Sequence, residues 1–143
     1  MSQKTAINLQ IITPEKIVYS ETVDMVTVPA VEGEIGILPN HIPIFTKIKP
    51  GEIIVKKGST EEYLAITGGF VNVQGGKVSI LADYAIRSED IEISRAEEAR
   101  KKAEEAMKNK ESITNMAIAE SELRKALLEL KVSQRKKSPR IQI

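Results

Sequence analysis

Few residues of this chain carry side chains that enzymatic chemistry requires. The chain has no cysteine, which excludes disulfide bonds, thiolate metal sites and cysteine nucleophiles. Its single histidine, His41, cannot form a multi-histidine metal site. His41 could act as a general base, but no serine nucleophile motif and no carboxylate pair set apart by an apolar pocket accompanies it, so a structural or interface role is the better interpretation. We expect no catalytic residue and no metal site.

Two glycine-containing segments resemble loops that bind phosphate or RNA. Residues 75–78 (GGKV) lack the first glycine of a phosphate-binding loop and the hydroxyl residue that follows its lysine. Residues 33–36 (GEIG) have the spacing of an RNA-clamping loop, but the carboxylate of Glu34 would repel phosphate. Both segments are better interpreted as turns.

The elements that position any site divide the chain into two parts. All 8 glycines and five of the 6 prolines precede Ile91, and residues 91–138 contain neither type. Short runs in the first part, such as Ile7, Leu9 and Ile11, alternate apolar with polar residues, which is typical of half-buried strands. About ten such runs predict an antiparallel β-sandwich or a flattened barrel.

The second part predicts two helices, which makes the fold class α+β. Ser88 or Asp90 could cap the first helix. Apolar residues recur in steps of three and four on each helix, as expected for two stripes that pack in an antiparallel hairpin: Ala96, Ala99, Ala103 and Ala106 with Met107 beside it, then Met116, Ala119, Leu123, Ala126 with Leu127, and Leu130. Each alanine buries about one methyl group, worth ~0.8 kcal/mol. We therefore expect a hairpin that undocks easily unless the sandwich or a partner holds it.

Charge and composition exclude several classes of protein. The net charge is +1, and the first 90 residues hold 8 basic and 11 acidic groups, whereas the remainder holds 13 basic and 9 acidic groups. Aromatic residues form 3% of the chain, which argues against base stacking and hence against nucleic acid as a partner. No apolar run approaches the about 20 residues of a membrane span, and the N-terminal segment has no apolar signal core or arginine-rich presequence, so we expect a cytoplasmic chain without direct membrane insertion.

Two segments of the first part carry a specific family resemblance. Residues 23–51 (VDMVTVPAVEGEIGILPNHIPIFTKIKPG) and 67–85 (TGGFVNVQGGKVSILADYA) resemble the epsilon subunit of bacterial and chloroplast F-type ATP synthases, the counterpart of mitochondrial delta. The turn glycines, the prolines and the histidine occur in the same order, and the match extends from about Ala6 to Lys131. The resemblance implies a β-sandwich at 1–88, a regulatory helical hairpin at 89–135 and a basic tail at 136–143, which we expect to be disordered.

The resemblance also implies a function and a set of partners. Epsilon subunits are non-catalytic rotor proteins that bind the gamma subunit and the c-subunit ring and couple proton or sodium movement to ATP synthesis. In bacteria the hairpin can extend toward the catalytic beta and alpha subunits and hinder ATP hydrolysis. The expected location is the cytoplasmic face of the bacterial plasma membrane, as a peripheral part of the complex.

The family positions fall on two groups of residues. Glu34 and His41 match positions at the lower end of the sandwich, where it meets the c ring and gamma. Basic residues of the second helix and the tail match the region that meets an acidic segment of the catalytic head: Arg124, Lys125, Lys131, Arg135, Lys136 and Lys137. Opposite charges would steer that contact and make it sensitive to salt.

Some bacterial epsilon subunits bind ATP through the motif Ile/Leu-Asp-x-x-Arg-Ala. Here the corresponding residues are Ile91, Glu92, Arg95 and Ala96, with glutamate in place of aspartate, and Lys102 stands where binding proteins usually have an arginine. The lysine lacks the bidentate fork of an arginine. No cofactor is required, and ATP is a possible regulatory ligand. An ATP-sensing regulator is therefore the alternative function, and a nucleic-acid-binding β domain with a basic arm is a third.

Overall fold

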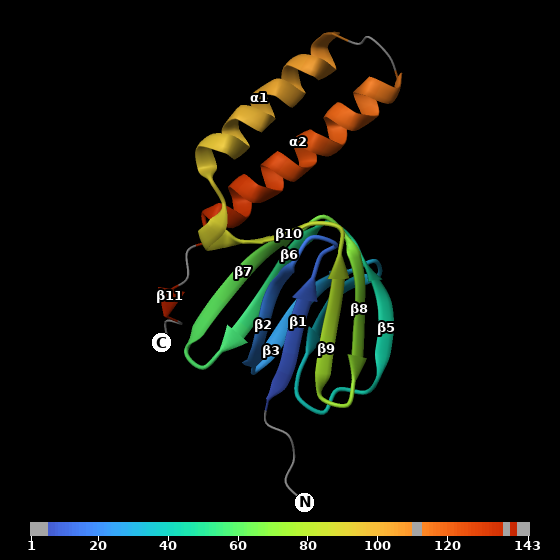
Figure 1. The fold of residues 1–143 in the computed structure, drawn as a ribbon, viewed down its shortest axis with the longest axis vertical. Coiled ribbons are helices and arrows are strands. Elements are labelled where there is room, and N and C mark those ends of the chain that lie inside the picture. Colours follow the sequence, from blue (N-terminus) through green and yellow to red (C-terminus); the bar gives the residue numbers. More distant parts are fainter. Residues whose placement is uncertain (1–5, 110–112, 136–137, 140–143) are drawn as a thin grey trace, which may run out of the picture.

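The computed structural model describes residues 6–109, 113–135 and 138–139. A β-sandwich is followed by a hairpin of two helices that projects from one end of the sandwich (Figure 1). The α+β class and the order of its two parts are therefore confirmed. The first strand, β1 (Ile7–Ile12), runs toward the helices from the opposite end of the sandwich.

The first ten strands form the sandwich. Their bounds are β1 Ile7–Ile12, β2 Ile17–Val23, β3 Met25–Ala30, β4 Gly33–Ile37, β5 Ile44–Ile48, β6 Gly51–Lys57, β7 Thr60–Ile66, β8 Gly69–Gln74, β9 Lys77–Ala82 and β10 Ala85–Arg87. They pair in the order β10-β7-β6-β3-β5-β8-β9-β1-β2, with β4 paired to β3 alone. Every pairing is antiparallel except that of β1 with β9, which is parallel and departs from the expected pattern. A parallel pairing is possible there because most of the sandwich separates the two strands in sequence.

Inward-facing aliphatic side chains fill the interior of the sandwich. Four of these side chains, one from each of four strands, are 0% exposed: Ile53 on β6, Leu64 on β7, Val71 on β8 and Ile80 on β9. On most strands alternation places one side in the core and the other toward solvent. On β7 the last four residues are all buried, because Tyr63 and Ala65 pack against Val132 of the hairpin. The sandwich therefore has a continuous aliphatic core of its own, independent of the helices.

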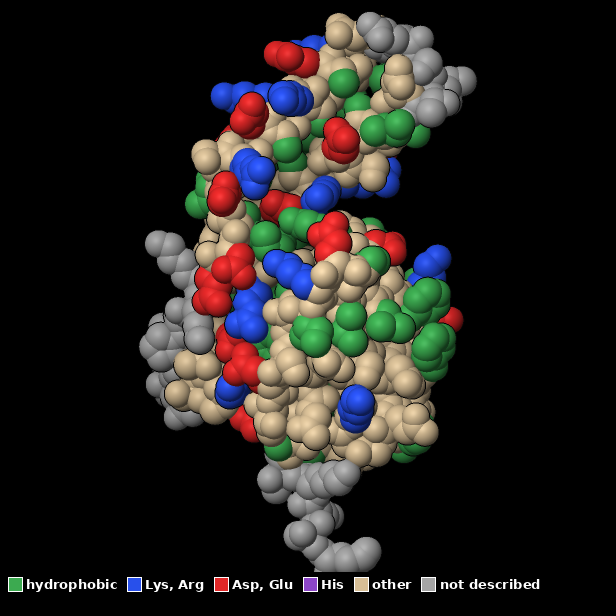
Figure 2. Space-filling view, viewed as in Figure 1, with side chains coloured by type: hydrophobic (Ala, Val, Ile, Leu, Met, Phe, Trp, Pro, Cys, Tyr) green, Lys and Arg blue, Asp and Glu red, His purple; other side chains and the backbone are tan. Residues whose placement is uncertain are grey.

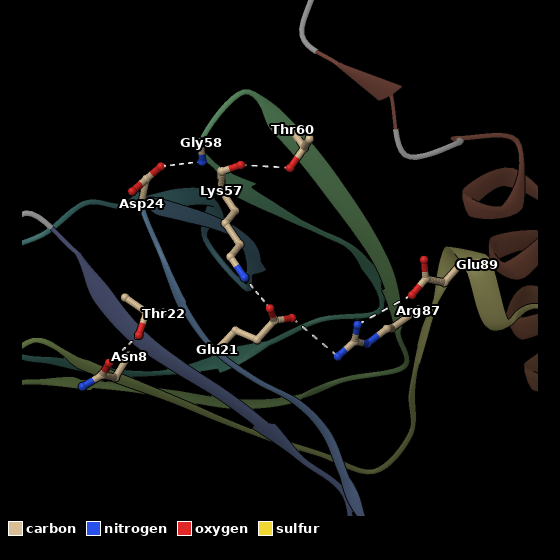
Figure 3. Close-up of polar contacts among 9 residues, drawn as sticks. All are labelled: Asn8, Glu21, Thr22, Asp24, Lys57, Gly58, Thr60, Arg87 and Glu89. Carbon is tan, nitrogen blue, oxygen red and sulfur yellow. Dashed lines mark hydrogen bonds and ion pairs between the residues drawn. The ribbon is translucent and has the colours of Figure 1, made fainter.

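A polar seam joins β2 to β6 and β10, the strands that face it across the sandwich (Figure 3). Glu21 on β2 forms ion pairs with Lys57 and, at 3.8 Å, with Arg87. Arg87 also pairs with Glu89 at 3.6 Å and lies over the ring of Tyr19. The hydrogen bond from Lys57 holds the pKa of Glu21 below its ordinary value. The seam covers strand edges and fixes the last residue of the sandwich, Arg87, from which the hairpin departs.

The two glycine segments have different conformations. Gly75 and Gly76 have φ of 57° and 80°, and they form the tight β8–β9 turn that the sequence indicated. Residues 33–36, in contrast, are not a turn: they lie within β4 and pair with β3. The turn between β3 and β4 lies just before them, at Val31 and Glu32, since both glycines are strand residues of β4.

The hairpin consists of α1 (Ile93–Asn109) and α2 (Ile113–Ser133), preceded by the short 3₁₀ helix η1 (Ser88–Asp90). The expected cap at Ser88 or Asp90 is wrong, because those residues form η1 and α1 begins three residues later. The alanine stripe is half confirmed: Ala96 and Ala103 are buried, whereas Ala99 and Ala106 are exposed. On α2 the buried alanines are Ala119 and Ala126. The seven-residue spacing on both helices is that of closely packed helices.

The C-terminal segment adds a short strand, β11 (Ser138–Pro139), which pairs with Glu61 and Thr60 of β7. This pairing extends the edge of β7 beyond the residues that pair with β10. The expected disorder of 136–143 stays a prediction. Lys136 and Lys137 lie outside the described residues.

Candidate functional site

The hairpin meets the sandwich over a small apolar contact. Val132, near the end of α2, is 0% exposed and packs with Tyr63 and Ala65 of β7 and with Ile91, which follows η1. Leu128, one turn earlier on α2, adds to this cluster. Ile91, the first residue of the expected ATP motif, therefore has a packing role in this contact.

Tyr84 forms a second contact between the sandwich and α2. Its hydroxyl donates a hydrogen bond to Oε1 of Glu129 at 2.9 Å, and Nζ of Lys125 lies 3.7 Å from the centre of its ring. Burial and the hydrogen bond to Glu129 raise the pKa of Tyr84, so its hydroxyl stays protonated and remains a donor. Lys125, which was expected to meet the catalytic head, thus lies against the sandwich in this state.

Arg135 forms a third contact, just after α2 ends. Its guanidinium pairs with Oε1 of Glu52 on β6 at 3.2 Å and lies 5.2 Å from the ring centre of Tyr63. The side chain of Glu52 is 13% exposed, whereas that of Arg135 is 48% exposed. A second expected head-binding cation is therefore also held by the sandwich.

Two further cations expected to bind the head, Arg124 and Lys131, are exposed. Arg124 pairs with Glu120 one turn earlier at 2.6 Å, and its side chain is 71% exposed. Lys131 is exposed, and its charge lowers the pKa of Glu52. The four cations therefore divide into two that hold the sandwich directly, Lys125 and Arg135, and two that are presented to solvent.

A groove of about 410 Å³ lies between the two helices and the end of the sandwich. Arg95 and Ala96 of the expected ATP motif line it together with Lys102 and Lys125. Figure 2 shows basic side chains in the gap between the hairpin and the sandwich. Glu92, in contrast, does not line the groove; it is 67% exposed and lies 4.0 Å from Arg95.

The groove offers charges of both signs. Three cations, Arg95, Lys102 and Lys125, could contact phosphate oxygens. Glu122 and Glu129 also line it, and their carboxylates oppose a polyphosphate but could accept hydrogen bonds from an amine or a sugar hydroxyl. The arrangement is chemically suited to a nucleotide, although two of the four motif residues, Ile91 and Glu92, lie outside the groove.

Glu34 and His41 do not form one surface. Glu34 follows the first residue of β4 and pairs with Pro29, close to the end of the sandwich that carries the hairpin. His41 lies in the loop between β4 and β5, at the end of these strands remote from Glu34, and its Nδ1 lies 2.7 Å from the carbonyl oxygen of Ile42. The two residues therefore do not lie together at one end of the sandwich, because β4 runs between them.

An outward apolar face was missed by sequence reasoning. Phe45 and Phe70 on β5 and β8 stack with ring centres 5.5 Å apart, and they are 66% and 42% exposed. Leu81, opposite Phe70 on β9, is 52% exposed, and Figure 2 shows apolar side chains gathered over this side of the sandwich. Exposed neighbouring aromatic rings are typical of protein interfaces. A signal was available, since these are the only two phenylalanines of the chain.

The described residues hold neither a cluster of metal-ligating side chains nor a helix that could span a membrane. Residues 6–109, 113–135 and 138–139 contain no group of three or more histidine, cysteine or acidic side chains that could hold a metal ion. Within the same residues, neither helix has the length and apolarity needed to cross a membrane.

Comparison with known families covers nearly the whole chain. Residues 6–88 match the model of the ATP synthase delta/epsilon chain beta-sandwich domain. Residues 89–134 match the model of the ATP synthase delta/epsilon chain long alpha-helix domain.

Curated bacterial proteins are similar along almost their full length. The ATP synthase epsilon chain of Herpetosiphon aurantiacus is 47% identical over 128 residues, which cover 89% of this chain and 93% of the relative. Those of Dehalococcoides mccartyi and Chloroflexus aggregans are 44% and 42% identical, and each match covers at least 94% of this chain and 98% of the relative.

Solved structures share the fold at low sequence identity. A chain of the Euglena gracilis mitochondrial ATP synthase, in an OSCP/F1/c-ring assembly, superposes with a TM-score of 0.77 at 23% identity, covering 94% of this chain and 84% of that one. A chain of the Tetrahymena thermophila mitochondrial ATP synthase central stalk and c ring has a TM-score of 0.57 at 17% identity, covering 92% and 99%.

Proposed function

The chain belongs to the ATP synthase delta/epsilon family, and on that premise we propose that it is the non-catalytic epsilon-type subunit of the central stalk, with a hairpin that inhibits ATP hydrolysis. In this role it turns with the gamma subunit and the c ring and couples proton or sodium movement to ATP synthesis. It acts as a peripheral component at the cytoplasmic face of the bacterial plasma membrane.

The sandwich is the anchoring part in this proposal. Its outward apolar face, formed by Phe45, Phe70 and Leu81, supplies the apolar area that a stable contact with gamma requires. The loop of His41, at the end remote from the helices, faces the c ring. Glu34 lies at the opposite end, so we assign it to neither of these two surfaces.

The hairpin is the inhibitory part, and its loose attachment is the observation that carries the proposal. The contacts with the sandwich come from the C-terminal half of α2 and the segment that follows it: Lys125, Leu128, Glu129, Val132 and Arg135. Release of these contacts frees Lys125 and Arg135, which then join Arg124 and Lys131 on an acidic segment of the catalytic beta and alpha subunits. The same cations therefore serve both states, as a switch between two nearly balanced arrangements requires.

The test uses a bacterial catalytic core that lacks its own epsilon subunit. ATP hydrolysis is measured for the core alone, for the core with the full chain, and for the core with the charge-reversed variant Arg124→Glu. Arg124 lines a cavity beside Thr67 of the sandwich, but its ion pair is with Glu120 of its own helix. The variant therefore leaves in place the docking contacts of Val132, Glu129 and Arg135. The matched control is Lys101→Glu, which reverses an exposed cation on α1.

We expect the full chain and Lys101→Glu to slow hydrolysis, and Arg124→Glu to bind the core equally well but to inhibit several-fold less. Equal inhibition by Arg124→Glu and the unaltered chain would show that this cation does not meet the head. Failure of all three chains to bind a cognate core would remove the rotor role itself.

ATP as a regulatory ligand is the second candidate, because the groove brings together Arg95, Ala96, Lys102 and Lys125. Titration calorimetry of the full chain with MgATP tests it, with Arg95→Ala and the exposed α1 variant Lys101→Ala as a pair. Heat that disappears only in Arg95→Ala supports the site. Absence of heat at millimolar MgATP removes it.

A further inference from the structure

Glu52 is a carboxyl group covered by the end of the hairpin. It lies on the outward face of β6, two residues before Ile54, which packs in the cluster around Val132. Its side chain is 13% exposed, although strand residues on an outward face are ordinarily solvated. Arg135, just beyond α2, pairs with this carboxylate, so the hairpin end contributes to its cover.

The two oxygens of Glu52 have different surroundings. Oε1 pairs with Arg135 at 3.2 Å. Oε2 is buried and has no hydrogen-bond partner among the described residues. A buried carboxylate with one oxygen unsatisfied is disfavoured relative to its neutral form, because burial without a hydrogen-bond donor costs a charged group more than a neutral one.

Charged groups from three elements face Glu52. From α2 and its end come Lys131 and Arg135, which favour the carboxylate, and from β4 comes Glu34, which opposes it. On β7, Tyr63 donates its hydroxyl hydrogen bond to Glu61 at 2.6 Å rather than to Glu52. Burial is the largest influence, and the pKa of Glu52 is raised despite the two nearby cations.

We propose that Glu52 makes docking of the hairpin dependent on pH, with docking tightest when its carboxyl group is neutral. Undocking withdraws Val132 and Arg135 and returns Glu52 to water, where the carboxylate is fully hydrated. The proton is therefore bound more tightly in the docked state than in the undocked state. Docking is strongest below the pKa of the exposed carboxyl and weakens as pH rises through the higher pKa of the docked one. The inference concerns the chain alone and holds whether or not the proposed function does.

The test measures docking in the full-length chain. Because the chain has no cysteine, Asn72→Cys on β8 and Ala117→Cys on α2, both exposed, can carry a fluorescent donor and acceptor without other labelled sites. Energy transfer is followed from pH 5 to pH 8. The ratio of docked to undocked chains should fall with rising pH, by up to about tenfold for each unit between the docked and undocked pKa of Glu52.

Two variants separate this effect from general charge effects. Glu52→Gln, which keeps the shape and stays neutral, should remain docked across the pH range. Glu98→Gln on the exposed side of α1 should keep the pH dependence of the unaltered chain. Weaker docking of Glu52→Gln at pH 8 would overturn the proposal, because it would show that the ion pair with Arg135 outweighs burial.

A direct titration keeps the proposal testable if a labelled variant folds poorly. The ¹³C shift of the Glu52 carboxyl is recorded against pH in the unlabelled full chain. A pKa above that of exposed glutamates supports the proposal, and a pKa at or below theirs overturns it.

Discussion

The sandwich and the hairpin are stabilised in different ways. The sandwich buries large aliphatic side chains from almost every strand, whereas the described part of the two helices buries four alanines and Val132. Since hydrophobic stabilisation follows the apolar area removed from water, the sandwich has a large reserve and the hairpin a small one. One chain thus contains a part that holds its shape and a part whose attachment small changes can shift.

The largest expected effect is on the sandwich core. Leu64→Ala removes a side chain that is 0% exposed, so it should lower the free energy of unfolding by about 3 kcal/mol. Urea unfolding followed by circular dichroism measures it. Leu81→Ala, at a leucine that is 52% exposed, is the matched control and should change stability little. Equal losses in both variants would contradict the assignment of Leu81 to an outward face.

The next effect is on docking, and it should leave the sandwich intact. Val132→Ala removes two methyl groups from the contact between α2 and β7, so it should weaken docking by about 2 kcal/mol. Hydrogen exchange should then rise in α1 and α2 but not in β8 or β9. The control is Leu127→Ala on the exposed side of α2, at a leucine that is 48% exposed. Exchange that rises equally in sandwich and hairpin would show that the two parts do not separate.

A smaller effect is expected at Tyr84. Tyr84→Phe keeps the ring beneath Lys125 but removes the hydroxyl that donates to Glu129, so docking should weaken by about 1 kcal/mol. The same hydrogen-exchange measurement detects it. Tyr63→Phe is the matched control, since that hydroxyl bonds to Glu61 on its own strand. If hydrogen exchange of the helices became faster in Tyr63→Phe but not in Tyr84→Phe, the hydroxyl that supports docking would be that of Tyr63 and not that of Tyr84.

Local patterns explain why most of the fold was predictable. Alternation at Ile7, Leu9 and Ile11 and the glycines of the β8–β9 turn act over a few residues, and sequence displays them directly. The boundary of α1 was misplaced because Ser88 and Asp90 are good capping residues used instead in a 3₁₀ turn. The parallel pairing of β1 with β9 depends on contacts between strands far apart in sequence, which no local pattern encodes.

The site was less predictable for a related reason. Lys125 and Arg135 were identified as interaction residues, but their contacts with Tyr84 and Glu52 depend on how the hairpin meets the sandwich. Glu52 lies on the outward side of β6, where strand residues are ordinarily solvated, yet it pairs with Arg135 beyond α2 and is 13% exposed. Ile91 matched a ligand motif but packs against Val132. Residues whose surroundings come from another part of the chain cannot be placed from their own neighbours.

The smallest expected effect on stability is at Arg124. This position compares the two parts most sharply, because inhibition by the hairpin should change there while the stability of the chain does not. Arg124 and Glu120 are an exposed pair four residues apart, worth about 0.3–0.5 kcal/mol, and alanine has a slightly higher helix propensity than arginine. Arg124→Ala should therefore leave unfolding nearly unchanged, while inhibition of hydrolysis falls several-fold and becomes less sensitive to salt. Glu120→Ala, which removes the partner but keeps the cation, should retain inhibition. If Arg124→Ala instead unfolded the hairpin, Arg124 would be needed for the stability of the hairpin. Its roles in stability and in inhibition could then not be separated.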